Sequence, residues 1–230
     1  MEPTTLSLIV PLYNERWNLP ELIRQCAHAL NATGEAWEMI LVDDGSNDGS
    51  FEYLQEVQRQ MPRLTVLRHP TRRGKTAGYA TGFAAARGVY LFTIDADLQE
   101  NPEGLGSMLA LLRSGTADMV VGWRRRRRDP FLKIWASRLF NTGLRILFGL
   151  SLHDANCGFR GMRCEVARIL LPWLERDFHR YLPLIAHRLG YRVSEVEVEH
   201  RPRAHGRSRY GLERYVHAIA DLWVLWRRLG

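Results

Sequence analysis

Two acidic clusters, each placed directly after a short apolar run, are the residues of this chain best suited to chemistry. Residues 43–46 are Asp-Asp-Gly-Ser, and residues 95–99 are Asp-Ala-Asp-Leu-Gln. Two carboxylates one residue apart can share Mg²⁺ or Mn²⁺ with a ligand, because these cations usually take one or two carboxylates together with substrate phosphates. Asp and Gly also follow strands simply because they form turns, so either cluster alone leaves both interpretations open.

The elements around these clusters predict where they lie. The first half alternates short apolar runs with helical patterns, which is typical of βαβ units in a mainly parallel α/β sheet covered by helices on both faces. Ligands of such sheets bind at the carboxyl ends of the strands. Both clusters then lie at one edge of one sheet, which favours a shared site over two unrelated turns. The expected strands are residues 6–10, 39–42, 64–67, 89–94 and 118–121, and the expected helices are 20–30, 50–60, 75–87 and 102–113.

The second half is more basic and carries two long amphipathic patterns. Five arginines occupy positions 124–128, and apolar residues recur at helical spacing over 130–149 and again over 212–226. No linker or repeat divides the chain, so we expect a single domain over 1–230 with two halves, 1–123 and 124–230. Further helices are expected at 165–174 and 182–189, and a strand at 193–198.

The composition narrows the class of protein. A chain of 230 residues that is 46% hydrophobic and 25% charged is expected to fold around one core. Its three cysteines form no CxxC pair, which argues against a disulfide framework or structural zinc and for a reducing compartment. No signal peptide is recognisable, and no apolar run reaches the roughly 18 residues needed to span a bilayer. The chain also lacks GxxxxGK[ST] and GxGxxG motifs, which disfavours P-loop NTPases and dinucleotide dehydrogenases.

Four ordered motifs lie within the first half: Val10-Pro11-Leu12-Tyr13-Asn14-Glu15, Asp43-Asp44-Gly45-Ser46, Gly74-Lys75 and Asp95-Ala96-Asp97-Leu98-Gln99. Their order and spacing resemble the family 2 glycosyltransferases of GT-A (Rossmann-like) fold, and within them the dolichol- or polyprenyl-phosphate mannose and glucose synthases. The resemblance implies a nucleotide-sugar donor in the half 1–123 and a Mg²⁺ or Mn²⁺ cofactor. The donor-binding residues that it implies are Pro11, Tyr13, Glu15, Asp43, Asp44, Lys75, Asp95, Asp97 and Gln99, of which Asp95, Asp97 and Gln99 organise the metal.

Three motifs of the second half, at residues 137–141, 153–160 and 203–211, also resemble the polyprenyl-phosphate sugar synthases. Arg209 stands where that family more often has Lys and keeps the charge. The QxxRW motif of processive polysaccharide synthases is absent from the sequence. The resemblance therefore implies that the half 124–230 binds a polyprenyl phosphate, dolichyl or undecaprenyl.

A lipid phosphate is already anionic near neutral pH, so its attack on a sugar needs no general base. It needs cations that hold it in line, and a metal that takes up charge on the departing diphosphate. We therefore predict an inverting transfer of mannose or glucose to polyprenyl phosphate, and we expect the run 125–128 to be a solvated surface. Arginine suits the acceptor site because its planar fork pairs with two phosphate oxygens. The predicted acceptor-phosphate residues are Arg124, Arg138, Arg203, Ser208 and Arg209, and the predicted catalytic set is Asp97, Arg124, Arg138 and Arg209.

The two amphipathic patterns have two interpretations. Stripes at helical spacing usually face a core, whereas aromatic and basic residues together are typical of interfacial helices on a bilayer. Trp135, Phe140, Phe148, Trp223 and Trp226 are flanked by basic residues, and the implied acceptor is a lipid. We therefore expect docking on a membrane surface, as a peripheral protein of the cytoplasmic face.

Other classes of function stay open at this point. A family 2 enzyme acting on a glycan or small hydroxyl acceptor would need a carboxylate base near Asp154, which we otherwise expect to orient an arginine or to cap a turn. A donor-binding protein without catalysis would share the same motifs. The net charge of +7 could suit nucleic acid. We expect no nucleic-acid partner, however, because the basic residues concentrate after Gly122 whereas the nucleotide motifs precede it.

Overall fold

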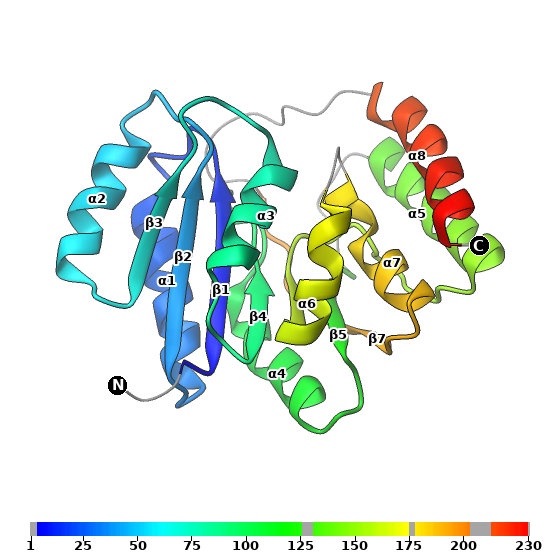
Figure 1. The fold of residues 1–230 in the computed structure, drawn as a ribbon, viewed down its shortest axis with the longest axis horizontal. Helices are drawn as coiled ribbons and strands as arrows, with labels where there is room; N and C mark the ends of the chain where they lie inside the picture. Colours follow the sequence, from blue (N-terminus) through cyan, green and yellow to red (C-terminus); the bar gives the residue numbers. More distant parts are fainter. Residues whose placement is uncertain (1–3, 126–130, 175–177, 203–212, 230) are drawn as a thin grey trace.

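The computed structural model describes residues 4–125, 131–174, 178–202 and 213–229, with the backbone alone for residues 131–136, 138 and 213–220. Over these ranges, a seven-stranded sheet has the order β3-β2-β1-β4-β6-β5-β7 (Figure 1). All strand pairs are parallel except those of β6, which runs antiparallel to β4 and β5. The strands are β1 (Leu6–Leu12), β2 (Trp37–Asp43), β3 (Leu64–Arg68), β4 (Tyr90–Thr93), β5 (Met119–Trp123), β6 (Arg160–Arg163) and β7 (Val193–Glu197).

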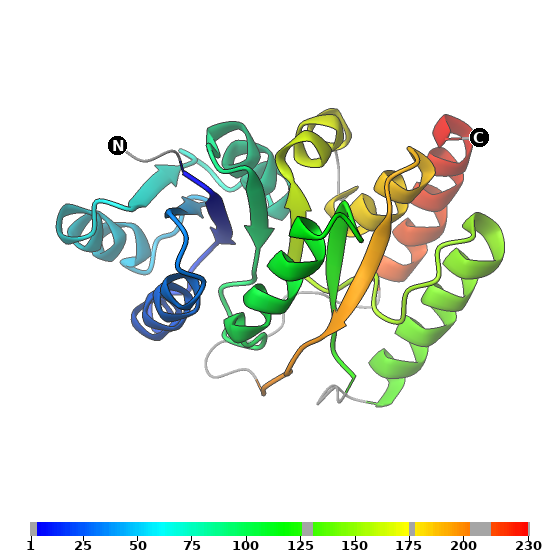
Figure 2. The ribbon, with the colours of Figure 1, turned by 90° about the horizontal axis from the view of Figure 1, so that it is seen from below.

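Helices cover both faces of this sheet. Figure 2 shows α1 and α4 on one face and α3 and α6 on the other, while α5 and α8 lie side by side at one end, packed on α7. The helices are α1 (Leu19–Ala32), α2 (Ser50–Gln60), α3 (Lys75–Ala85), α4 (Leu105–Arg113), α5 (Phe131–Phe148), α6 (Cys164–Leu170), α7 (Leu182–Arg188) and α8 (Glu213–Leu229). Short 3₁₀ turns are η1 (Pro102–Gly104), η2 (Leu171–Trp173) and η3 (Phe178–Tyr181).

The central strands β1 and β2 are buried along their whole length, as their mostly apolar sequences predict. Helix α3 approaches β1 closely at two glycines. A Cβ at Gly82 would lie 2.3 Å from Cγ2 of Ile9, and one at Gly78 would lie 2.8 Å from Cβ of Pro11. The missing side chains therefore let α3 pack against the strand, and this packing fixes Lys75 at the first position of the helix.

The predicted mainly parallel α/β fold is confirmed, with one strand missed. The sequence analysis assigned no strand to β6, whose four residues include two arginines. Arg160 is nevertheless 2% exposed, because its guanidinium donates to the backbone oxygens of His179 and Ala155. Burial of an arginine by bonds to distant backbone groups leaves no pattern in the local sequence.

Candidate active site

The two acidic clusters meet at one edge of the sheet, as predicted. Asp43 is the last residue of β2, and Asp95 follows β4 by two residues. Strand β1 lies between these two strands and is parallel to both. The carboxyl ends of β1, β2 and β4 therefore share an edge, and the polar residues after them face a common region.

Lys75 and Asp95 form the central ion pair of this edge. The Nζ atom of Lys75 lies 2.5 Å from Oδ1 of Asp95, and both side chains are about three-quarters buried, at 23% and 26% exposure. Burial by itself would raise the pKa of Asp95, but Lys75, and then Arg124 and Arg160, outweigh it and hold this pKa below its usual value. Asp95 is therefore an anion in a partly enclosed site.

Gly158 fits against the same carboxylate from the other side. A Cβ at position 158 would lie 2.4 Å from Oδ1 and 2.7 Å from Cγ of Asp95. Its carbonyl oxygen accepts a 2.7 Å hydrogen bond from the hydroxyl of Thr93 in β4. This hydrogen bond joins the segment before β6 to the last residue of β4, two residues before Asp95.

The turn after β4 continues into a strained segment. Leu98 has φ of 61°, a left-handed conformation that is unusual for a bulky residue and that clusters at functional sites. Next to it, Asp97 is 8% exposed and accepts a 3.2 Å bond from the backbone of Gln99. The Gln99 side chain donates to the Arg201 carbonyl at 3.4 Å, and the backbone carbonyl of Gln99 accepts the Arg201 amide at 2.7 Å. Gln99 therefore connects the acidic turn to the segment that leads toward residues 203–212.

Glu100 is a residue of this region that the sequence analysis missed. It is 3% exposed, and its Oε2 atom has no hydrogen-bond partner among the residues that the structure describes. Burial raises the pKa of Glu100 to about 8, and the negative charge of Asp95 adds to this shift. The sequence offered no signal, because a polar residue after the Asp-Ala-Asp turn suggests a solvated loop.

The oxygen ligands at this site fit a hard divalent cation that takes most of its other ligands from substrate and water. Asp95 and Asp97 present carboxylates from one turn, and Glu100 adds a buried oxygen close by that has no partner within the described ranges. Across the described residues, however, no group of three or more His, Cys, Asp or Glu side chains is arranged to hold an ion by itself. Mg²⁺ and Mn²⁺ meet this description, since they bind through one or two carboxylates plus phosphates.

Asp43 and Asp44 lie at this edge but have bonding partners within the protein. Asp44 is 4% exposed and accepts bonds from His69 Nδ1 at 2.8 Å and from the backbone amides of residues 73 and 74 at 2.8 and 2.7 Å. Asp43 accepts the Ser46 amide at 3.2 Å and lies 3.4 Å from Nε of Arg68. Asp44 therefore holds the loop that precedes Lys75, whereas contact of either residue with a nucleoside stays a prediction.

The other predicted donor residues lie at the end of β1 and directly after it. Pro11 is buried near the end of the strand, and Tyr13 is partly buried with the Arg72 guanidinium 4.6 Å from its ring centre. Glu15 accepts a 2.6 Å bond from the side chain of Asn18. Pro11 thus lies in the strand, Tyr13 and Glu15 lie between β1 and α1, and contact of the three residues with a donor stays a prediction.

Arg124 extends the region into the second half. Its Nε and Nη2 atoms lie 2.7 and 3.1 Å from the two oxygens of Asp154, and its Nη1 lies 3.5 Å from Glu100. The Arg124 side chain is 13% exposed and that of Asp154 3%. The expectation that Asp154 orients an arginine is confirmed.

The remaining predicted acceptor residues are not described at the level of side chains. Arg138 lies in α5, where only its backbone is described, and Arg203, Ser208 and Arg209 fall outside the described residues. Their part in acceptor binding stays a prediction.

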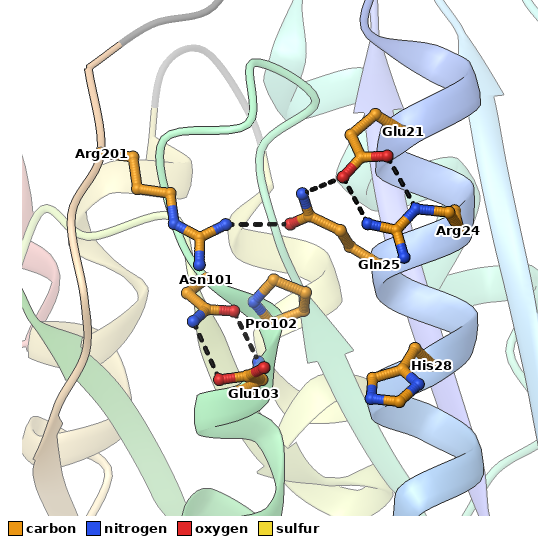
Figure 3. A pocket seen from close by; sticks show the side chains of 8 residues that line it. All are labelled: Glu21, Arg24, Gln25, His28, Asn101, Pro102, Glu103 and Arg201. Atoms are coloured by element: carbon orange, nitrogen blue, oxygen red, sulfur yellow. Dashed lines mark hydrogen bonds and ion pairs between the residues drawn. The ribbon is translucent and has the colours of Figure 1, made fainter.

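A polar cavity of about 360 Å³ lies between α1 and η1 (Figure 3). Arg201 reaches across it, with Nη1 3.3 Å from Oε1 of Gln25. The lining contains neither Asp95 nor Asp97, so the cavity lies apart from the acidic turn. Its lining residues are Glu21, Arg24, Gln25, His28, Asn101, Pro102, Glu103 and Arg201.

Helices α5 and α8 expose a set of large apolar side chains. Leu139, Ile146 and Leu147 of α5 are 70%, 74% and 66% exposed, and Trp223 and Trp226 of α8 are 58% and 59% exposed. In contrast, Phe148 is buried and belongs to the core, and the side chain of Trp135 is not described. No described helix is both long and apolar enough to cross a bilayer.

Known proteins provide matches over most of the chain. Residues 7–170 match the family model of glycosyl transferase family 2. The chain is 34% identical over 218 residues to an undecaprenyl-phosphate 4-deoxy-4-formamido-L-arabinose transferase of Pseudomonas paraeruginosa, covering 94% of this chain and 63% of the relative. It is 34% identical over 221 residues to a dodecaprenyl-phosphate galacturonate synthase of Rhizobium johnstonii, covering 94% and 65%. The chain thus spans slightly less than two thirds of these relatives.

Solved structures share the fold. A mannosyltransferase of Pyrobaculum calidifontis, solved with GDP-Man and Mn²⁺, has a TM-score of 0.64 and 19% identity, covering 89% of this chain and 60% of that one. This likeness confirms the expected GT-A architecture. Together with the family match over residues 7–170, it means that the chain belongs to glycosyl transferase family 2.

Proposed function

We propose that this protein transfers a hexose, mannose or glucose, from a nucleotide sugar to a polyprenyl phosphate on a membrane surface. The proposal rests on one observation. Asp95 and Asp97 of the first half lie close to the Arg124–Asp154 ion pair of the second half. Such a site offers anionic ligands for a metal–diphosphate on one side and a fixed cation on the other. The names of the two curated relatives, both polyprenyl-phosphate enzymes, support this choice of acceptor.

On the donor side, Asp95, Asp97 and Gln99 would hold the metal. Bound there, Mg²⁺ or Mn²⁺ would neutralise charge on the leaving diphosphate. Lys75 forms an ion pair with Asp95. Among the cationic side chains that the structure describes, Lys75 is the one that we expect also to bind a donor phosphate. The nucleoside would lie over the segment from Pro11 to Glu15, beside the loop held by Asp44.

On the acceptor side, the reaction forms one bond and breaks one. A phosphate oxygen of the lipid attacks the anomeric carbon, the bond from that carbon to the diphosphate oxygen breaks, and nucleoside diphosphate leaves. The configuration is inverted, and no proton has to be removed from the acceptor. Arg124, with Arg138, Arg203, Ser208 and Arg209, would hold the phosphate by charge-assisted hydrogen bonds.

The rival acceptor, a glycan or small hydroxyl compound, needs a carboxylate base. Asp154, which lies closest to that role in the sequence, is buried and bound by two nitrogens of Arg124. A carboxylate held in this way has both oxygens directed at Arg124 rather than at an acceptor hydroxyl. This geometry favours the anionic acceptor over the hydroxyl one.

A lipid acceptor also explains the exposed face of α5 and α8. The apolar side chains of this face lie near Arg145, Arg227 and Arg228, which are exposed on the same helices. Aromatic and basic residues in this combination bind anionic bilayers. We propose that this face rests on the cytoplasmic surface of the membrane and presents the site to the lipid headgroup.

The deciding experiment has two steps. Thermal-shift measurements with UDP-glucose, UDP-galacturonic acid and GDP-mannose, each with and without Mg²⁺ or Mn²⁺, identify the donor, because a ligand that binds only the folded state raises its stability. The donor is then incubated with undecaprenyl phosphate, undecaprenol or a soluble glycan. Product with the phosphate alone supports the proposal, whereas transfer to the glycan, or no shift with any donor, would overturn it.

A further inference from the structure

The side chain of Asn141 forms two hydrogen bonds with the backbone and has no role in the reaction proposed above. This residue lies in α5 and is 6% exposed. Its Nδ2 donates a 2.6 Å hydrogen bond to the carbonyl of His153, and its Oδ1 accepts a 3.3 Å bond from the amide of Ala155. The two backbone groups flank Asp154, so one side chain holds the peptide on both sides of that carboxylate.

This contact continues directly to the site. Asp154 binds Arg124 through two nitrogens, at 2.7 and 3.1 Å, and Arg124 lies 3.5 Å from Glu100. Four residues after Asp154, Gly158 packs against the carboxylate of Asp95. A shift of the segment 153–158 would therefore move the acceptor-side cation and the donor-side acid together.

We propose that Asn141 is a positioning residue: it ties α5 to Asp154 and so fixes Arg124 relative to Asp95. The inference rests on the proposed transfer reaction and adds a link from the lipid-facing helix to the site. Leu139 and Ile146, on the same helix, carry the exposed apolar face. Seating of that face on a bilayer and placement of Arg124 are then mechanically connected through the Asn141 side chain.

The chemistry of the contact requires an amide. A carboxylate at position 141 keeps an acceptor for the Ala155 amide but turns an oxygen toward the His153 carbonyl, which repels it. An apolar side chain leaves the buried Ala155 amide and the His153 carbonyl without this partner. Asn141→Asp and Asn141→Leu therefore break the contact in different ways and should affect the reaction in the same direction.

The test is a double-mutant cycle on the intact chain with the identified donor and undecaprenyl phosphate. Asn141→Leu and Asn141→Asp should each lower kcat by about 10-fold or more, because small misplacements of catalytic groups carry such costs. The donor-induced thermal shift should be retained. Thr142→Ala, at the exposed neighbouring position of α5, is the control and should keep wild-type kcat.

The cycle separates positioning from general destabilisation. If Asn141 acts through Asp154, then Asn141→Leu in an Asp154→Asn background should cost less than about 3-fold, since residues of one network are not additive. Three results would overturn the inference. Asn141→Leu could lower kcat by the same factor in the Asp154→Asn background as in the wild type, kcat could be unchanged in both Asn141 single variants, or kcat could fall only in proportion to the folded fraction. Failure of wild-type protein to use undecaprenyl phosphate would instead count against the proposed function.

Discussion

The α-carbon of Gly158 faces the carboxylate of Asp95 so closely that a methyl group at position 158 would lie 2.4 Å from Oδ1. Because all three carboxyl atoms of Asp95 lie within 2.8 Å of that position, a small rotation does not relieve the clash. Gly158→Ala should therefore turn Asp95 away from Lys75 and lower kcat/KM about 100-fold. Gly106→Ala, at a helical glycine with open space around it, is the matched control and should stay active. Equal activity of both variants would contradict the assignment.

Removal of the Lys75 ammonium should weaken donor binding. Lys75→Met leaves the Asp95 carboxylate without its ion-pair partner and removes a cation from the phosphate region. We expect the donor-induced thermal shift to fall, and kcat/KM to drop by on the order of 100-fold. Arg73→Met removes an exposed charge two residues away and should change both quantities little. A similar loss in the two variants would indicate a general effect of net charge.

Asp44 should prove important for stability as well as for activity. Its buried carboxylate accepts bonds from His69 and from the backbone of residues 73 and 74. Asp44→Ala leaves these donors unpaired, so the free energy of unfolding in urea should fall by about 2 to 4 kcal/mol. For Glu52→Ala, at an exposed position of α2, the free energy of unfolding should fall by less than about 0.5 kcal/mol. A variant that loses donor binding at wild-type stability would instead assign Asp44 to the nucleoside.

Membrane binding should depend on the two exposed tryptophans of α8. We expect a Trp223→Ser and Trp226→Ser double variant to lose partition onto vesicles that contain anionic lipid, because both apolar area and interfacial aromatic rings are removed. Co-sedimentation with vesicles measures this loss. Trp17→Ser is the control, since Trp17 is 78% exposed but precedes α1, far along the chain from this face. Equal loss in the control would show non-specific adhesion.

Stability at acidic pH should reveal the ion pair that joins β5 to β7. Hydrogen bonds from Arg192, at 2.8 to 3.0 Å, hold the pKa of Asp118 below its usual value. The stabilisation is then complete above about pH 4, the ordinary pKa of Asp, and is lost as pH falls through the lowered pKa. Asp118→Asn should be less stable than wild type at pH 7, with a difference that shrinks as pH falls below about 4. A difference that is constant with pH would contradict this origin.

The sequence predicted the acidic edge because its signals are local. Asp43 and Asp95 follow apolar strands, and parallel strands bring their carboxyl ends together. The helices matched closely for the same reason. Residues 50–60 were expected to be helical and are observed as α2. The helix expected at 165–174 ends at Leu170 and is followed by the turn η2, which contains Pro172.

The contacts that surround these acidic residues could not be predicted in this way. Glu100 appeared to be a polar loop residue, and only the folded structure shows it enclosed beside Arg124. Gly158 and Asn141 stood out in the sequence only through the resemblance to polyprenyl-phosphate sugar synthases. Their reasons, a steric gap beside Asp95 and an amide around Asp154, depend on segments that meet only in three dimensions.

The position of β6 in the sheet also affects how the chain is made. This strand lies between β4 and β5, yet it is synthesised after both of them. On a chain emerging from the ribosome, the facing edges of β4 and β5 therefore stay unpaired until residues 160–163 are available, and unpaired edges can associate with other chains. β6 thus joins the two parts of the sheet late in biosynthesis, and β7, which pairs with the other edge of β5, is synthesised later still.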